Sequence, residues 1–312
     1  MTSPKESAWL SHQDAAPIYQ KYEAHPLLRD TFVAQIRQAW GNPYHPLLTS
    51  YLDVERQDQH ITYPGHARPI KATVLTPKKC LPHRTFIYLH GGSWMAGLSG
   101  KHLAWAMDIA QRAQITVVAV EYCLAPEFPF PEGLLDCVAV YQHYRTHKPN
   151  HTIFVGGDSA GGNLGAALCC YAADHNLPMP DGLLALSPMM DLHMEKYPSV
   201  AHYGVGNPVA DMSLLYFQRS CYLPDPQQWQ NPYASPLYGD LTTFPPTLVV
   251  CGTADALYDD NRAFMDRCRQ AEVTLHTHIA KDMPHSFFTQ MEVIPKIAGQ
   301  ANNKIATFLQ EV

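Results

Sequence analysis

The strongest constraint on the fold is a regular alternation, from Pro64 onwards, of short apolar or β-branched segments with longer segments of helical periodicity. Two of the short segments, ITVVAV at residues 115–120 and TLVV at residues 247–250, are almost continuously apolar. Such strands are typical of parallel sheets whose two faces are both covered by helices. The expected strands are Ile70–Leu75, Thr85–Leu89, Ile115–Val120, Thr152–Val155, Gly182–Leu186, Thr247–Val250 and Val273–His278. The alternation predicts an α/β fold with a mostly parallel sheet.

Two regions interrupt this alternation. Residues 11–40 have helical periodicity before any strand appears. Residues 192–238 are rich in Pro, Tyr and Gln and separate two strands that would otherwise follow each other directly. We interpret both regions as additions to the sheet domain.

The composition disfavours several other classes of protein. The 312 residues include 28 acidic and 22 basic side chains, and a net charge of -6 disfavours binding to nucleic acid. The eight cysteines form no CxxC pair and no Cys/His spacing suited to a metal ion, so we predict no metal. Residues 1–23 contain no apolar signal segment, and no apolar run is long enough for a membrane span, so a cytoplasmic protein is expected.

The segment Gly157-Asp158-Ser159-Ala160-Gly161 lies between a predicted strand and a predicted helix and fits the pattern G-x-S-x-G. A sharp turn there lifts the serine hydroxyl above the sheet, and the flanking glycines let strand and helix approach closely. The alternative is a glycine-rich turn whose serine only caps the helix. The strand before it and the helix after it favour Ser159 as a nucleophile.

A serine nucleophile needs a histidine base and a carboxylate, which in this kind of fold follow it in the order acid, then histidine. Asp255 is the expected acid because it lies in the loop after the strand at 247–250. Asp259 and Asp260 are alternatives, but they fall at the start of the next helix, where carboxylates commonly act as caps. Among 17 histidines, His285 follows the last predicted strand and is the predicted base.

The third requirement is a set of donors for the negatively charged oxygen of the tetrahedral intermediate. The segment HGGSW at residues 90–94 follows a predicted strand, and its backbone N–H groups are unobstructed by side chains. We predict Gly91, Gly92 and Ser93 as donors, together with the N–H of Ala160.

These motifs resemble the hormone-sensitive-lipase-like family of α/β-hydrolases, which includes bacterial acetyl esterases and carboxylesterases. HGGSW matches the family's HGGG[FW] loop, and GDSAGGN at residues 157–163 matches its nucleophile elbow. YCLAPE at residues 122–127 is similar to its YRLAPE segment, and landmarks at Ser187, Asp255 and His285 follow in the family's order. The resemblance spans roughly residues 65–310.

The resemblance implies an α/β-hydrolase fold with about eight strands, the triad described above and no cofactor. We also predict Trp94 and Asp158 as substrate-binding residues. Family members carry a helical cap, which here would comprise residues 1–50 and 191–239, beside a catalytic domain of residues 51–190 and 240–312.

Two positions depart from the family's pattern. Ser93 replaces the third glycine of HGGG, which restricts its φ angle and places a hydroxyl beside the acyl carbonyl. Cys123 replaces the arginine of YRLAPE and so removes a charged partner near Glu127.

The features together predict a serine carboxylesterase that hydrolyses small-molecule esters with short- to medium-chain acyl groups through an acyl-enzyme intermediate. One alternative is an amidase or aryl formamidase with the same triad. Another is a non-catalytic small-molecule receptor on the same fold, although the retention of His285 argues against it. The oligomeric state stays open, a homo-oligomer included.

Overall fold

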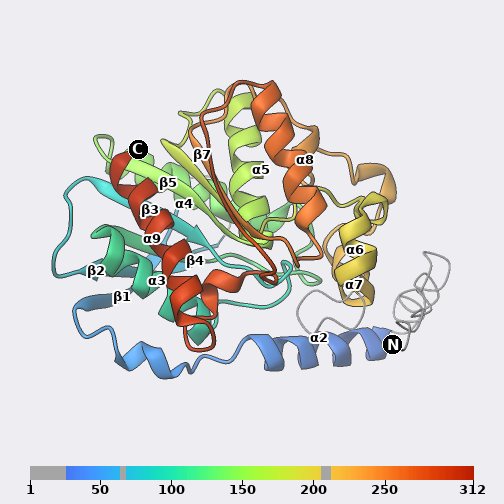
Figure 1. Cartoon of the computed structure of the whole chain (residues 1–312), viewed down its shortest axis with the longest axis horizontal. Coiled ribbons are helices and arrows are strands. Elements are labelled where there is room, and N and C mark those ends of the chain that lie inside the picture. The colour runs from blue at the N-terminus through green and yellow to red at the C-terminus, as the bar shows by residue number, and fades with distance from the viewer. Residues whose placement is uncertain (1–25, 64–67, 205–211) are drawn as a thin grey trace, which may run out of the picture.

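A mixed eight-stranded sheet forms the centre of the computed structural model, which describes residues 26–63, 68–204 and 212–312 (Figure 1). The strand order is β1-β2-β4-β3-β5-β6-β7-β8. The strands are β1 (Val54–Ile61), β2 (Ile70–Pro77), β3 (Arg84–Leu89), β4 (Thr116–Glu121), β5 (Thr152–Asp158), β6 (Gly182–Leu186), β7 (Thr247–Gly252) and β8 (Leu275–Ala280). β2 pairs antiparallel with both β1 and β4, and the remaining neighbours pair in parallel. The predicted α/β fold with a mostly parallel sheet is confirmed.

All the predicted strands are present, with ends that differ by a few residues, and β1 is an additional strand. Its sequence, VERQDQHI, buries only Val54 and Ile61 because it is the edge strand of the sheet. By contrast, every residue of β6 and β7 is buried, as expected for strands covered on both faces.

Helices cover both faces of the sheet, and each layer encloses its own buried apolar cluster (Figure 1). One face carries α3 (Gly100–Ala113) and α9 (Pro295–Glu311). The other face carries α4 (Glu132–His147), α5 (Ala160–Asp174) and α8 (Tyr258–Gln270). Short 3-10 helices connect these elements: η1 (Pro46–Thr49), η2 (Met194–Lys196), η3 (Pro226–Gln228), η4 (Pro236–Tyr238) and η5 (Phe287–Thr289).

Three of the described helices lie outside these two layers: α2 (Pro26–Trp40), α6 (Pro198–Tyr203) and α7 (Met212–Tyr222). In Figure 1, α2 runs along the lower edge of the molecule, with α6 and α7 above its N-terminal part. The rings of Phe32 in α2 and Phe217 in α7 meet edge to face, with centroids 4.8 Å apart. These helices belong to the two regions interpreted as additions, of which residues 11–25 and 205–211 lie outside the described residues.

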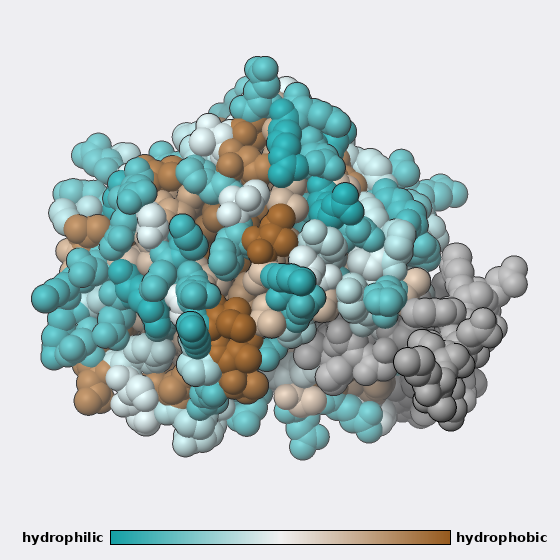
Figure 2. Space-filling view, in the orientation of Figure 1, coloured by the Kyte–Doolittle hydropathy of each residue, from teal (hydrophilic) through white to brown (hydrophobic). Residues whose placement is uncertain are grey.

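The surface seen in Figure 2 is mostly hydrophilic, with hydrophobic side chains in separate small patches. Most apolar side chains are instead buried in the two clusters that flank the sheet. Within the described ranges, no helix combines the length and apolar character that crossing a bilayer requires.

Candidate active site

The predicted nucleophile stands at a strained turn between β5 and α5. Ser159 has φ 54° and ψ -117°, a backbone conformation that non-glycine residues rarely adopt and that clusters at functional sites. A Cβ atom added to Gly157 or Gly161 would lie 1.7 or 1.8 Å from the carbonyl oxygen of Leu89. The two glycines are therefore required by the close approach of β3, and they fix the elbow at the carboxyl end of the parallel strands.

The predicted acid and base are brought together by the loops that follow β7 and β8. His285 Nδ1 lies 2.9 Å from Asp255 Oδ2 and 3.1 Å from Oδ1. Asp255 is fully buried, and its Oδ1 also accepts a hydrogen bond from the N–H of Leu257 at 2.9 Å. The N–H of Ala254 donates to the carbonyl of Met283 at 3.0 Å, so the two loops are bonded to each other.

The two alternative acids have other partners. Asp259 Oδ2 accepts the N–H of Ser199 at 2.8 Å, and Asp260 Oδ2 accepts the N–H of Met190 at 2.6 Å. Both lie in the first turn of α8, where they hold neighbouring segments against the helix. Their positions favour Asp255 as the partner of His285.

Opposing effects act on the pKa of His285. Burial of the imidazole lowers the pKa, whereas the charge of Asp255 and its hydrogen bond raise it. Asp158 raises it further and Lys101 lowers it, and the net pKa lies above the ordinary value of 6.5. The ring is thus held as an effective base whose protonated form is stabilised by Asp255.

Ser159 and His285 line one cavity of about 360 Å³, together with Gly92, Ser93 and Asp158. A second wall comes from the end of α2 and the segment after it, namely Ala39, Trp40, Asn42, Tyr44 and His45. The remaining lining residues are Ser99, Lys101, His102, Ser286 and Thr289. Among the residues that the structure describes, no cluster of three or more His, Cys, Asp and Glu side chains is arranged to hold a metal ion.

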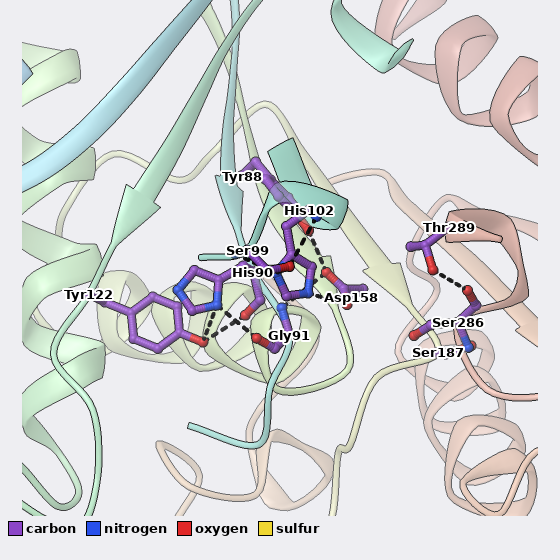
Figure 3. Close-up of polar contacts among 10 residues, drawn as sticks. All are labelled: Tyr88, His90, Gly91, Ser99, His102, Tyr122, Asp158, Ser187, Ser286 and Thr289. Atoms are coloured by element: carbon purple, nitrogen blue, oxygen red, sulfur yellow. Dashed lines mark hydrogen bonds and ion pairs between the residues drawn. The ribbon is translucent and has the colours of Figure 1, made fainter. Parts of the chain in front are cut away.

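Asp158 is bonded to the loop that was predicted to bind the oxyanion (Figure 3). Its Oδ1 accepts the hydroxyl of Tyr88 at 2.7 Å and the N–H of Gly91 at 3.0 Å. His102 Nε2 lies 3.9 Å from Asp158 Oδ2. The prediction that Gly91 donates to the oxyanion is therefore corrected, because its only N–H already holds the loop to Asp158. Gly92 and Ser93 line the cavity, as does Asp158 itself.

Trp94 is not among the residues that line this cavity, contrary to the expectation that it contacts the substrate. Its side chain is 2% exposed and stacks on Tyr222 of α7, with centroids 4.1 Å apart and planes 7° from parallel. Gly92, Ser93 and Trp94 all have positive φ, and the tight turn they form carries the indole into the contact between the sheet domain and α7.

Arg37 of α2 attaches the cavity wall to the segment that directly follows HGGSW, a role that sequence reasoning did not find. Its guanidinium donates to the carbonyls of Met95 at 2.9 Å and Ala125 at 3.0 Å. It also binds both carboxylate oxygens of Glu127, at 2.7 and 2.6 Å. Position 123 is a cysteine here, where the family has an arginine. The positive partner of Glu127 is instead Arg37, from a helix far away in the sequence.

Cys123 occupies a position whose neighbours are also charged. Its N–H donates to Asp136 Oδ2 at 2.7 Å, and Arg68 donates to both oxygens of that carboxylate at 2.9 and 3.1 Å. Burial and the negative charge of Asp136 raise the pKa of the Cys123 thiol to about 12. The thiol is consequently protonated and unreactive near neutral pH.

Comparison with known proteins gives consistent matches. A family model described as the α/β-hydrolase fold matches residues 86–289. An esterase from Acinetobacter venetianus is 34% identical over 223 residues, which cover 71% of this chain and 73% of that protein. An acetyl-hydrolase from Streptomyces hygroscopicus is 31% identical over 68% of this chain and 71% of its own length.

Solved structures match over nearly the whole chain. A hyperthermophilic esterase from Pyrobaculum calidifontis has a TM-score of 0.81 over 94% of this chain and 96% of its own, with 24% identity, and it shares the fold. An esterase of the bacterial hormone-sensitive lipase family has a TM-score of 0.76 and 29% identity, over 90% of this chain and 97% of its own. The chain therefore belongs to the α/β-hydrolase family and to its hormone-sensitive-lipase-like branch of esterases.

Proposed function

We propose that the chain is a serine carboxylesterase in which Ser159 is the nucleophile, His285 the general base and Asp255 the acid that orients it. The observation that carries the proposal is the buried Asp255–His285 pair, which opens onto the same cavity as the strained Ser159. The esterases among its relatives support ester hydrolysis as the reaction.

The acid fixes which nitrogen of the base can act. With Nδ1–H donated to Asp255, His285 Nε2 carries the lone pair that accepts the proton of the Ser159 hydroxyl. The serine oxygen then attacks the ester carbonyl, and the protonated His285 gives its proton to the departing alcohol. Water activated by the same nitrogen hydrolyses the acyl-enzyme and releases the acid.

The oxyanion donors in this proposal are the backbone N–H groups of Gly92, Ser93 and Ala160. Gly92 and Ser93 lie in the cavity wall, and Ala160 is the first residue of α5, directly after the nucleophile. Each such donor typically contributes 100- to 1000-fold in rate, because it is aimed at charge that develops only in the transition state.

The size of the cavity supports the part of the proposal that concerns the substrate, namely esters with short- to medium-chain acyl groups. Its volume of about 360 Å³ is at the lower end of small-molecule sites, which measure about 300–1,000 Å³. The stacked pair of Trp94 and Tyr222 fills the space between the oxyanion loop and α7. Relatives named acetyl-hydrolase and ethyl acetate hydrolase support small acyl groups as well.

In the same proposal, residues 1–50 and 191–239 form a cap over the catalytic domain of residues 51–190 and 240–312. Its described helices support this, since α2 and α7 meet through Phe32 and Phe217. α2 also continues into the wall of the cavity at Ala39 and Trp40.

The decisive experiment compares the wild-type protein with Ser159→Ala on 4-nitrophenyl acetate. The wild type is expected to turn over, and Ser159→Ala is expected to lose at least about 1000-fold in kcat while keeping its far-UV circular dichroism. Ser220→Ala, which removes a hydroxyl bonded to the carbonyl of Phe217 in α7, is the matched control. An inactive wild type, or full activity in Ser159→Ala, overturns the proposal.

A series of 4-nitrophenyl esters from acetate to dodecanoate tests the acyl preference, and the highest kcat/KM is expected at the short end. An N-formyl arylamide distinguishes the amidase or formamidase alternative. A higher kcat/KM for the amide than for the matched ester would favour that alternative over the esterase.

A further inference from the structure

Lys101 is a cationic side chain in the cavity that the mechanism above does not use. It is the second residue of α3, and it lines the cavity together with Ser159 and His285. Its neighbour His102 lies against Asp158 and Ser99 (Figure 3). Lys101 itself is exposed to solvent, so its ammonium group is accessible to a ligand.

The carboxylate and the histidines that line the cavity have partners within the protein. Asp158 accepts two hydrogen bonds through Oδ1, His285 is paired with Asp255, and His45 Nε2 lies 3.3 Å from Glu292. In the part of the chain that the structure describes, Lys101 has neither a hydrogen bond nor an ion pair. Among the described residues that line the cavity, Lys101 therefore carries a positive charge with no direct counter-ion.

Folding stability does not explain a lysine at this position. The N-terminal end of a helix carries partial positive charge, so a cation in the first turn of α3 is on the unfavourable side of the helix dipole. The protein around the ammonium also lowers the pKa of Lys101, and the charge of Asp158 raises it only partway back. The helix that carries Lys101 therefore gains nothing from its charge, whereas an anionic ligand in the cavity would.

The position of Lys101 relative to the base indicates which part of a substrate it would meet. In the proposed mechanism His285 protonates the departing alcohol, so the alcohol portion of the ester lies beside this histidine. Ser286 and Thr289, which follow His285 in the chain, also line the cavity. Lys101 and His285 line the same cavity, so one bound ester can meet both the ammonium and the base.

We propose that Lys101 is a specificity-determining residue that binds a carboxylate on the alcohol portion of the ester substrate. This inference rests on the proposed esterase function and names its substrate class. A single ammonium matches a monoanion, whereas the negative charges of Asp158 and Glu292 nearby disfavour a dianion such as a phosphate monoester. The substrates are therefore esters of hydroxy acids, with the hydroxyl acylated and the carboxylate free.

The test compares 4-acetoxybenzoate with its methyl ester, which share the acyl group and the aryl skeleton and differ in one negative charge. The measured quantity is the ratio of the two kcat/KM values, so intrinsic reactivity cancels between variants. In Lys101→Met the ratio of anionic to neutral substrate is expected to fall roughly 10- to 100-fold, the range of a charge-assisted hydrogen bond, mainly through KM. Lys101→Arg should keep the ratio within about threefold, because it keeps the charge.

Two controls separate a direct contact from general effects of charge. Lys78→Met removes the same charge from an exposed lysine that pairs with Asp53 at the other side of the sheet domain, and it should leave the ratio unchanged. Raising NaCl to about 0.5 M should shrink the wild-type ratio and leave that of Lys101→Met unaffected, since salt screens exposed charges.

Three outcomes would overturn the inference or its premise. If Ser159→Ala is inactive but Lys101→Met keeps the wild-type ratio, the esterase function stands and the inference fails. If the Lys101 dependence appears only with the acyl-side anion of mono-4-nitrophenyl succinate, measured against 4-nitrophenyl butyrate, the assignment to the alcohol portion is wrong. A wild-type protein that hydrolyses none of these esters would instead overturn the proposed function.

Thermal melts of Lys101→Gln and Lys101→Met check that loss of the charge leaves the fold intact.

Discussion

Replacing Asp255 by Asn tests the proposed catalytic pair with little disturbance of the fold. The carboxylate is fully buried, and its Oδ1 accepts the N–H of Leu257 at 2.9 Å. In Asp255→Asn the side-chain carbonyl oxygen can take the place of Oδ1 and accept the same hydrogen bond from Leu257. The NH2 group of the Asn then faces His285 Nδ1, which carried the proton in the wild type and must now accept one.

This change is expected to lower kcat by about 10⁴-fold. With Asn at position 255, neutral His285 carries its proton on Nε2, and this nitrogen can then no longer accept the proton of Ser159. The substitution also removes the charge and hydrogen bond that raise the pKa of His285. Burial then dominates, and the pKa falls from above 6.5 to below it. The acid limb of kcat/KM, which reports the neutral base in the free enzyme, therefore moves to lower pH as the maximal rate drops.

The assay is the pH dependence of kcat/KM for 4-nitrophenyl acetate, from about pH 5 to 9, with fluorescence and circular dichroism as checks of folding. Asp259→Asn is the matched control, since Asp259 Oδ2 accepts the N–H of Ser199 and Asn can do the same. The reasoning is refuted if Asp255→Asn keeps more than about a tenth of the wild-type kcat, or if its acid limb moves to higher pH.

Two further substitutions test the contacts behind the site. Tyr88→Phe removes the buried hydroxyl that donates to Asp158 at 2.7 Å, so urea unfolding should show a loss of about 1–2 kcal/mol, and an unchanged midpoint would contradict this. Arg37→Met removes bonds to Glu127 and to two backbone carbonyls, so it should cost about 2 kcal/mol and raise KM by loosening the wall at Trp40. Glu127→Gln should cost less than about 1 kcal/mol, because that ion pair is half-exposed and the carbonyl bonds stay; an equal loss in both variants would contradict the reasoning.

The strands that carry the site were predictable because they are buried on both faces. β5, β6 and β7 therefore show continuous apolar runs, whose ends coincide with the loops that hold Ser159 and Asp255. β1 has no such signal, since only Val54 and Ile61 at its two ends are buried and the polar residues between them carry no alternation. Its pairing with β2 is a tertiary property that local sequence does not encode.

Within the site, the proximity of Asp255 and His285 was predictable, whereas several hydrogen-bond and stacking partners were not. Asp255 and His285 lie together as their positions after β7 and β8 suggested. The bond that occupies the N–H of Gly91 depends on the conformation of its loop, and the stacking of Trp94 depends on α7, so neither could be read from a motif. Arg37 donates to backbone carbonyls 58 and 88 residues away, and a carbonyl target leaves no trace in the sequence.

The attachment of α2 through Arg37 does not depend on the side chains of the residues that it contacts in the sheet domain at Met95 and Ala125. Because the arginine bonds to the backbone carbonyls of Met95 and Ala125, the side chains at those positions can change without releasing the helix. The residues that follow this attachment form one wall of the cavity: Ala39, Trp40, Asn42, Tyr44 and His45. Substitutions in this wall are therefore expected to change which molecules enter the cavity without displacing Asp255 and His285, which the loops after β7 and β8 hold together.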